Sequence, residues 1–291
     1  MGSKEGIFHI SMAFLNPGDQ ALIPDPGYPG YAGTTRLVGA DPISYKLDGD
    51  NGWQPDWDYL ENLDTSKVKL MWINYPHMPT GAVANIQTFE RLVKWCENRR
   101  ILLCHDNPYS LILNPQLPMS LHSIPGSLRV GIELNSLSKG HQMAGWRVGM
   151  LTGNSAYIDA VVQVKSNIDS GMFKGIQDAA VEALQVGSNW HQTRDGIYKY
   201  RRTLVQQLMD LMDCTYEKET AGLFVWGKIP EHEEAVSFTD SILKEAKVFI
   251  VPGQVFGDGG RRYVRASLCV NESRIKEAIN RIKKLKNTIE A

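Results

Sequence analysis

Ser136–Gly149 reads SLSKGHQMAGWRVG, and this stretch decides how the 291-residue chain is interpreted. It lies between two apolar segments, Leu128–Leu134 and Arg147–Thr152, that we expect to be strands. Lys139 would then lie on a short turn at a strand end, where its amine can form an imine with an aldehyde. Arg147 and the neighbouring serines could reach one shared anion. A solvated lysine beside a salt-bridged arginine is the ordinary alternative for such a pair.

The sequence before this stretch predicts alternating strands and helices. Further strand candidates are Gln20–Pro24, Val68–Asn74 and Ile101–His105, which are short apolar runs. Gln87–Arg99 places apolar residues at the three-to-four spacing of an amphipathic helix. Strands separated by helices predict an α/β fold, with a mainly parallel sheet that helices cover on both faces.

From about residue 188 the pattern changes. Trp190–Met212 predicts a long helix, and Glu272–Lys286 predicts a final amphipathic helix. The strand candidates between them are Gly222–Ile229, Val248–Val251 and Tyr263–Leu268. We therefore expect a large domain over residues 1–200 and a smaller C-terminal α+β domain over residues 201–291.

The balance of charged residues indicates which kinds of binding partner to expect. The chain has 31 basic and 32 acidic residues, and it has no basic stripe. Proteins that bind nucleic acid or membrane surfaces usually show such a stripe, so we expect neither partner. No apolar stretch is long enough to span a bilayer, and the first residues do not resemble a signal peptide. The expected partner is a small molecule or another protein chain.

The four cysteines are Cys96, Cys104, Cys214 and Cys269. They lie far apart and form no CxxC pair, so we expect neither a zinc or other metal site nor a disulfide framework. Their positions inside apolar runs predict reduced, buried thiols, which favours a cytoplasmic location.

Two motifs predict ligand contacts in the N-terminal half. His105–Tyr109, HDNPY, follows an apolar strand, and Asp106 would lie where doubly wound sheets bind ligands. A turn-capping aspartate is the alternative. Gly2–Gly6, GSKEG, precedes a helical segment, and backbone N–H groups at a helix start can bind an anion.

Two more motifs point to an aromatic contact and an anion site. Asp25–Tyr31, DPGYPGY, contains prolines and glycines that fix a turn carrying Tyr28. Tyr263–Leu268, YVRASL, places Arg265 within an apolar strand, where burial is costly unless an anion pairs with the guanidinium. A tyrosine packed on a loop and an arginine exposed at a sheet edge are the ordinary alternatives.

Taken together, and in this order, the motifs resemble those of the class I/II aminotransferases, enzymes of fold type I that use pyridoxal 5′-phosphate (PLP). The cofactor-binding residues that this resemblance implies are Ser3, Lys4, Tyr28, Asp106, Tyr109, Ser136, Lys139 and Arg147, and the implied substrate-binding residue is Arg265. Lys139, Asp106 and Tyr109 are the implied catalytic residues.

The resemblance also implies a role for each residue. Lys139 would carry PLP through an imine bond and act as the base at the substrate Cα. Asp106 would keep the pyridine nitrogen protonated, so that the ring accepts electrons. Tyr109 would bond to the 3′-oxygen, and Arg265 would bind the substrate carboxylate. In the same way, Ser136 and Arg147, with Ser3 and Lys4, would hold the phosphate, and Tyr28 would stack on the pyridine ring.

The chain departs from the family pattern in two places. The family loop NPTG is replaced within Tyr75–Gly81, YPHMPTG, so Met78 stands where an asparagine is expected. A thioether cannot donate a hydrogen bond. Tyr109 would hold the 3′-oxygen alone, or His77 would partly substitute. Family members also carry a segment before GSKEG, which here begins at residue 2. We therefore expect uncovered apolar surface.

The function that the resemblance implies is transfer of an amino group from an amino acid to a 2-oxo acid, by a homodimer. Uncovered apolar surface would make this dimer weaker than usual or prone to aggregation. Two alternatives stay open: a carbon–sulfur β-lyase of the same fold, and a non-catalytic aminotransferase-like protein. GSKEG hints at diaminopimelate- or aspartate-type transaminases, without identifying the substrate.

Overall fold

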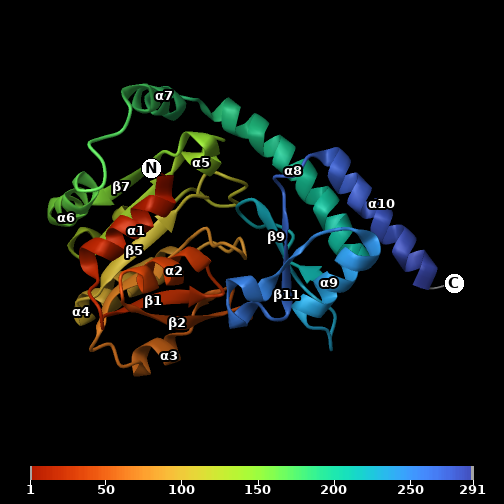
Figure 1. Ribbon diagram of the computed structural model, residues 1–291, viewed down its shortest axis with the longest axis horizontal. Helices are drawn as coiled ribbons and strands as arrows, with labels where there is room; N and C mark the ends of the chain where they lie inside the picture. The colour runs from red at the N-terminus through yellow and green to blue at the C-terminus, as the bar shows by residue number, and fades with distance from the viewer. Residues whose placement is uncertain (1, 290–291) are drawn as a thin grey trace.

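The computed structural model describes residues 2–289 and contains two sheets joined by a long helix (Figure 1). The larger sheet has the order β3-β2-β1-β4-β5-β6-β7. Its strands are β1 Gln20–Asp25, β2 Asp41–Asp48, β3 Gln54–Pro55, β4 Val68–Ile73, β5 Leu102–Asn107, β6 Gly131–Ser136 and β7 Gly149–Gly153. The five central strands are parallel, and β3 and β7 are antiparallel at the two edges. The predicted α/β class is confirmed.

Helices cover both faces of this sheet. One face packs against α1 (Gly2–Phe14), α2 (Pro29–Leu37) and α6 (Ser155–Ser166), and the other against α3 (Trp57–Asn62) and α4 (Ile86–Arg99).

Side chains of β5 alternate between these two layers, as strand geometry requires. Cys104 lies in the core beneath α1 and α2, whereas Leu103 lies in the core beneath α4. Asp106 shares the face of Cys104, and His105 shares the face of Leu103. Neighbouring residues of one strand thus enter different environments.

The smaller sheet has the order β10-β11-β9-β8, and all its pairings are antiparallel. Its strands are β8 Thr215–Tyr216, β9 Phe224–Lys228, β10 Val251–Pro252 and β11 Tyr263–Ser267. The remaining α-helices are α5 Leu137–Gly140, α7 Lys174–Leu184, α8 Ser188–Leu211, α9 Ala235–Ala246 and α10 Glu272–Ile289. Short 3-10 turns lie at Leu121–Ser123, Ser127–Arg129, Ala144–Trp146, Gly253–Phe256 and Asp258–Gly260. Figure 1 shows α8 running from the large sheet to the small one, where it lies beside α10.

Most predicted elements are confirmed, and four boundaries are wrong. The strand expected from Leu128 begins only at Gly131, because Ser127–Arg129 form a 3-10 turn. Arg147 does not begin a strand; its φ of 56° places it in the left-handed region before β7.

The other two errors concern a helix start and a short strand. GSKEG does not precede a helix, because it forms the first turns of α1. Of the segment Val248–Val251, only Val251 joins a strand.

Three of the four cysteines are buried as predicted, whereas Cys269 is exposed just beyond β11. The expectation of four buried thiols is therefore wrong at that position. Within residues 2–289, no helix is both long and apolar enough to cross a membrane.

Candidate active site

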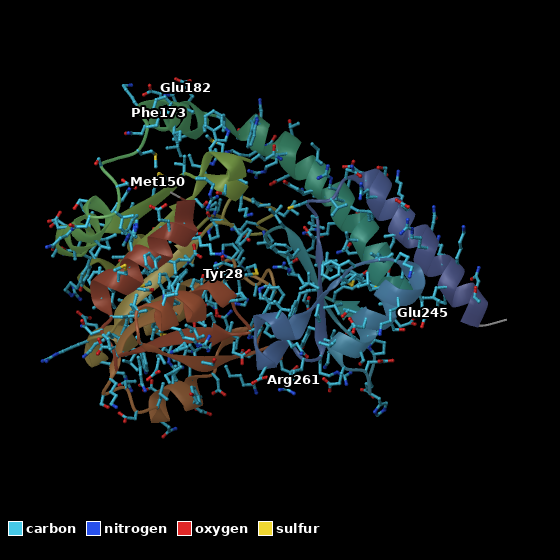
Figure 2. The ribbon with its side chains drawn as sticks, in the orientation of Figure 1. Tyr28, Met150, Phe173, Glu182, Glu245 and Arg261 are labelled. Atoms are coloured by element: carbon cyan, nitrogen blue, oxygen red, sulfur yellow. The ribbon has the colours of Figure 1, made fainter. Side chains whose placement is uncertain are left out.

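A cavity of about 470 Å³ opens between the two sheets, at the carboxyl ends of β4, β5 and β6. The nine residues predicted from the sequence to bind the cofactor or the substrate all line this cavity: Ser3, Lys4, Tyr28, Asp106, Tyr109, Ser136, Lys139, Arg147 and Arg265. Tyr28 lies between the large and small parts of the molecule (Figure 2). The small sheet and the 3-10 turn after β10 close the cavity with apolar side chains, including Phe224, Val251 and Phe256. Segments far apart in sequence thus meet at one site, as expected at the ends of parallel strands.

The carboxylate of Asp106 is buried, and only one of its two oxygens has a hydrogen-bond partner. The Tyr31 hydroxyl donates a 2.8 Å hydrogen bond to Oδ2, whereas Oδ1 has no partner in the structure. Burial raises the pKa of Asp106 to about 6, although the Tyr31 bond and the charge of His105 oppose this rise. An unpartnered oxygen in such a place is costly. It can accept a hydrogen bond from a cationic N–H group that enters the cavity.

Tyr31 is fixed as a hydrogen-bond donor. Its ring stacks on Trp72 with centroids 5.0 Å apart, and its side chain is fully buried. Burial, and then the nearby Asp106 charge, raise the pKa of Tyr31 well above its ordinary value, so the hydroxyl keeps its proton. The Tyr28 ring packs edge-on against Tyr31, and it closely approaches Gly30, where a Cβ atom would lie 2.3 Å from the ring. A side chain at Gly30 would therefore displace Tyr28.

Asn74 connects β5 to the loop that follows β4. Its Nδ2 donates to the Asp106 carbonyl at 2.7 Å, and its Oδ1 accepts from the Met78 N–H at 2.7 Å. Met78 thus lines the cavity with its backbone held in place. The sequence reasoning did not single out Asn74, although its position directly after an apolar strand is a usable signal.

One end of the cavity is built to receive an anion. The 13-residue helix α1 presents its N-terminus there, beside the guanidinium of Arg147. Gly2 has a φ of 71°, and a Cβ atom on it would lie 2.5 Å from the Arg147 guanidinium. Arg147 is steadied by the Ala144 carbonyl at 2.9 Å and the Ser138 hydroxyl at 3.4 Å. Unpaired N–H groups, a helix dipole and a guanidinium together suit a phosphate.

The amine of Lys139 is free to react. Lys139 lies in the short helix α5 directly after β6, and among residues 2–289 its amine has no hydrogen-bond or ion-pair partner. Ser136 begins this helix by accepting a hydrogen bond from the Ser138 N–H at 3.1 Å. The turn is therefore ordered while its amine remains available.

Arg194 is a site-supporting residue that sequence reasoning missed. Its guanidinium is buried on α8 and donates to the carbonyls of Gly140 and Leu111. Asp195 pairs with it at 2.8 Å. One arginine therefore fixes both the Lys139 turn and the loop after Tyr109. Nothing in the local sequence distinguishes it from the other arginines of this helix.

Arg265 enters the cavity from β11, an inner strand of the small sheet, so the alternative of edge exposure is wrong. Its guanidinium lies 4.0 Å from the ring centre of Phe224 and 4.4 Å from that of Phe256. Its Nη1 lies 3.2 Å from the Met78 sulfur. Within the described part of the chain no carboxylate pairs with it. Burial lowers the pKa of Arg265, yet an arginine stays charged, so this cation can bind an anionic ligand.

His77 does not take over the role of the expected asparagine. It is absent from the described lining of the cavity, and its Nδ1 bonds to the Thr80 hydroxyl at 2.8 Å. Burial lowers the pKa of His77 to about 3, so its ring is neutral. Tyr109 does line the cavity, with its ring packed edge-on against Phe224.

Sequence comparison identifies the family. Residues 1–282 match the family model described as aminotransferase class I and II. The chain belongs to this family. It is a PLP-dependent aminotransferase, an enzyme that moves an amino group from an amino acid to a 2-oxo acid.

Curated relatives support the same assignment. The chain is 41% identical over 286 residues to LL-diaminopimelate aminotransferase from Natranaerobius thermophilus, covering 97% of this chain and 73% of the relative. It is 38% identical over 283 residues to LL-diaminopimelate aminotransferase 2 from Trichormus variabilis, with the same coverage.

Solved structures show the same fold. The apo-BacF structure from Bacillus subtilis superposes with a TM-score of 0.91 at 35% identity, over 98% of this chain and 73% of that one. Aspartate aminotransferase from Thermotoga maritima superposes with a TM-score of 0.88 at 28% identity, over 98% of this chain and 74% of that one. The aminotransferase fold is therefore confirmed.

The cavity fits PLP chemically. It offers an unpartnered carboxylate oxygen on Asp106, a free amine on Lys139 and an anion site formed by α1 and Arg147. PLP carries a ring nitrogen, an aldehyde and a phosphate, which are the groups that these three features suit.

Asp106→Asn should stabilise the protein in the absence of PLP. The pKa of Asp106 rises from its ordinary value of 3.8 to about 6 on folding. The ionised carboxylate therefore lowers stability by about 3 kcal/mol above pH ~6, and this cost disappears below pH ~4. Urea unfolding should show a gain for Asp106→Asn at about pH 7.5 and almost none at about pH 4. The exposed Asp240→Asn serves as the control and should change little. A gain of equal size at both pH values would contradict this account of the Asp106 charge.

Proposed function

We propose that the nine cavity residues are the PLP and substrate site of this aminotransferase. Lys139 binds the cofactor covalently, and Asp106 Oδ1 accepts a hydrogen bond from its ring nitrogen. Tyr109 bonds to the 3′-oxygen, and Tyr28 covers the face of the ring. The phosphate-binding residues that we propose are Ser3, Lys4, Ser136 and Arg147. The observation that carries this proposal is the unpartnered, buried Asp106 oxygen in the same cavity as the free Lys139 amine.

When bound, PLP supplies an electron sink for the negative charge that develops at the substrate Cα. The protein residues supply the rest of the catalysis. Lys139 Nζ removes the Cα proton as general base. Arg265 binds the substrate carboxylate, because its guanidinium is half-buried, charged and free of carboxylate partners in the described chain. Asp106 stays anionic beside the ring nitrogen and keeps that nitrogen protonated.

We propose amino-acid biosynthesis as the setting, and LL-diaminopimelate as the first amino donor to test, because several relatives are named for it. A specific observation favours a second class of donor. The wall around Arg265 is apolar, with Phe224, Val255 and Phe256 lining the cavity. Such a wall suits aliphatic or aromatic side chains. Turnover measured with both classes of amino acid would decide between them.

We propose further that the chain divides into domains at about residue 200, within α8. The first half of α8 is tied to the large sheet through Arg194, which bonds to Gly140. The second half contributes Leu204 and Leu208 to the core of the small sheet. A boundary between residues 200 and 201 separates these two sets of contacts.

We also propose a homodimer in the cytoplasm. Apolar side chains gather on and near α7, where Phe173 is 75% exposed and Leu184 is 50% exposed. Phe173 and Glu182 lie at the outer side of the molecule (Figure 2). Exposed apolar side chains grouped in this way are typical of interfaces between protein chains. The buried, unpaired thiols of Cys96, Cys104 and Cys214 suit a reducing compartment.

Lys139→Ala should abolish the visible absorbance band that PLP acquires on binding, and should slow amino transfer at least about a hundredfold. Borohydride reduction of the wild-type protein should fix the PLP mass to the peptide that contains Lys139. Lys94→Ala is the matched control, since Lys94 is exposed on α4 and does not line the cavity. A band that persists in Lys139→Ala, or PLP mass on another lysine, would refute the assignment.

Met78→Asn should tighten PLP binding, because an amide can donate to the 3′-oxygen and a thioether cannot. One neutral hydrogen bond contributes about 0.5–1.5 kcal/mol, so a gain of roughly 2- to 12-fold is expected. Fluorescence titration with PLP measures it. Met78→Leu fills similar space without a donor and should leave the affinity unchanged. Equal affinities for the asparagine and leucine variants would show that no donor is needed there.

Leu184→Asp should weaken the proposed dimer by about tenfold or more, because burying a charge at an interface costs at least about 1.4 kcal/mol. Light scattering over a dilution series measures the change. Leu117→Asp is the control, since Leu117 is 90% exposed in a loop far from α7 in sequence. A wild-type protein that remains monomeric at high concentration would contradict the dimer itself.

A further inference from the structure

The imidazole of His105 lies on the face of the large sheet opposite to Asp106. Its two ring nitrogens contact two oxygen atoms that accept hydrogen bonds. Its Nδ1 is 3.0 Å from Glu133 Oε2, and its Nε2 is 2.8 Å from the Tyr75 carbonyl oxygen. The side chain is fully buried, and Phe89 of α4 packs edge-on against the ring. His105 directly precedes Asp106 but faces the opposite side of the sheet.

The two acceptors determine how many protons the ring carries. A neutral imidazole has one N–H donor and one bare nitrogen. A bare nitrogen at either position would face a lone pair at hydrogen-bond distance with no proton between them. When Glu133 is ionised, both contacts are favourable only if both nitrogens carry protons, which makes His105 an imidazolium cation. A buried cation is tolerated where a carboxylate pairs with it.

The hydrogen-bond donors around Glu133 stabilise its ionised carboxylate. Its carboxylate accepts from His105, from the Leu121 N–H at 2.6 Å and from the Ser120 hydroxyl at 3.0 Å. The Asn107 amide donates at 3.3 Å. Burial opposes ionisation, but the hydrogen bond and charge of His105, with the other donors, outweigh it and lower the pKa of Glu133 to about 2. His105 and Glu133 are directly opposite each other in the β5–β6 register.

The pair holds two walls of the active site in place. Through Glu133 it ties β5 to β6, the strand that ends at the Lys139 turn. Through the Tyr75 carbonyl it ties β5 to the loop that carries Met78. Glu133 and Asp106 are the carboxylates on which the His105 charge acts. Of these two, only Asp106 opens into the cavity.

We propose that His105 is a positioning residue, a protonated imidazolium paired with the ionised Glu133, that keeps the Asp106 carboxylate anionic and correctly placed for the ring nitrogen of PLP. Its part in keeping Asp106 ready for PLP rests on the proposed role of Asp106. The protonation of His105 does not, because it follows from the two acceptors and from the ionised state of Glu133.

The protonation state can be read directly by ¹⁵N NMR of the protein labelled at histidine. At about pH 7 His105 should show two protonated ring nitrogens, because both face acceptors. His77 is an internal control: it is also buried but contacts a hydroxyl, and it should keep one bare nitrogen. His105→Gln and His77→Gln assign the signals. Glu133→Gln, which barely changes shape, assigns His105 if its own variant does not fold. A bare nitrogen on His105 at about pH 7 would overturn the proposal.

A second experiment tests how the charge of His105 affects the pKa of Asp106. In Glu133→Gln the ring loses its counterion and becomes neutral, so the pKa of Asp106 should rise. The acid limit of PLP binding should then move to higher pH by about one unit. Glu97→Gln is the matched control on the exposed surface of α4 and should leave the limit unchanged. An unchanged limit in Glu133→Gln would refute the electrostatic role. If Asp106→Asn also leaves PLP affinity unchanged, the proposed role of Asp106 is wrong. The NMR experiment still tests the protonation of His105 independently.

Discussion

The structure around the active site depends on one costly feature, the buried carboxylate of Asp106. Placing a charge in the interior is unfavourable unless hydrogen bonds and opposite charges compensate it. Tyr31 satisfies one oxygen, and the stacking of Tyr31 on Trp72 fixes that donor. Asn74 holds the backbone carbonyl of the same residue. The second oxygen is left without a partner in a residue that lines the cavity, which suits the cationic ring nitrogen that we propose it binds.

Two cationic regions complete this arrangement from different parts of the chain. The large sheet supplies Arg147 beside the start of α1, and the small sheet supplies Arg265 between two aromatic rings. Neither guanidinium pairs with a carboxylate within residues 2–289. Protein surfaces normally pair such groups or leave them in water. Here both line one cavity with Lys139, which suits an anionic cofactor and an anionic substrate.

Much of the fold could be predicted from sequence, and so could the nine residues that line the cavity. Strands such as Val68–Ile73 are continuous apolar runs, and the motifs carrying Lys139 and Arg265 are local in sequence. Their supporting residues could not be predicted, because tertiary packing selects them. Arg194 meets Gly140 only after α8 has folded back onto the large sheet. Likewise, the strand pattern does not encode the left-handed backbone conformation of Arg147, whose guanidinium bonds to the Ala144 carbonyl.

The most direct test of this account is a crystal structure of the chain with PLP. The account predicts continuous electron density from Lys139 Nζ to the cofactor, and a ring nitrogen within hydrogen-bond distance of Asp106 Oδ1. It also predicts that the phosphate lies at the start of α1, against Arg147. PLP bound with its ring nitrogen away from Asp106, or bound outside this cavity, would contradict the central claim.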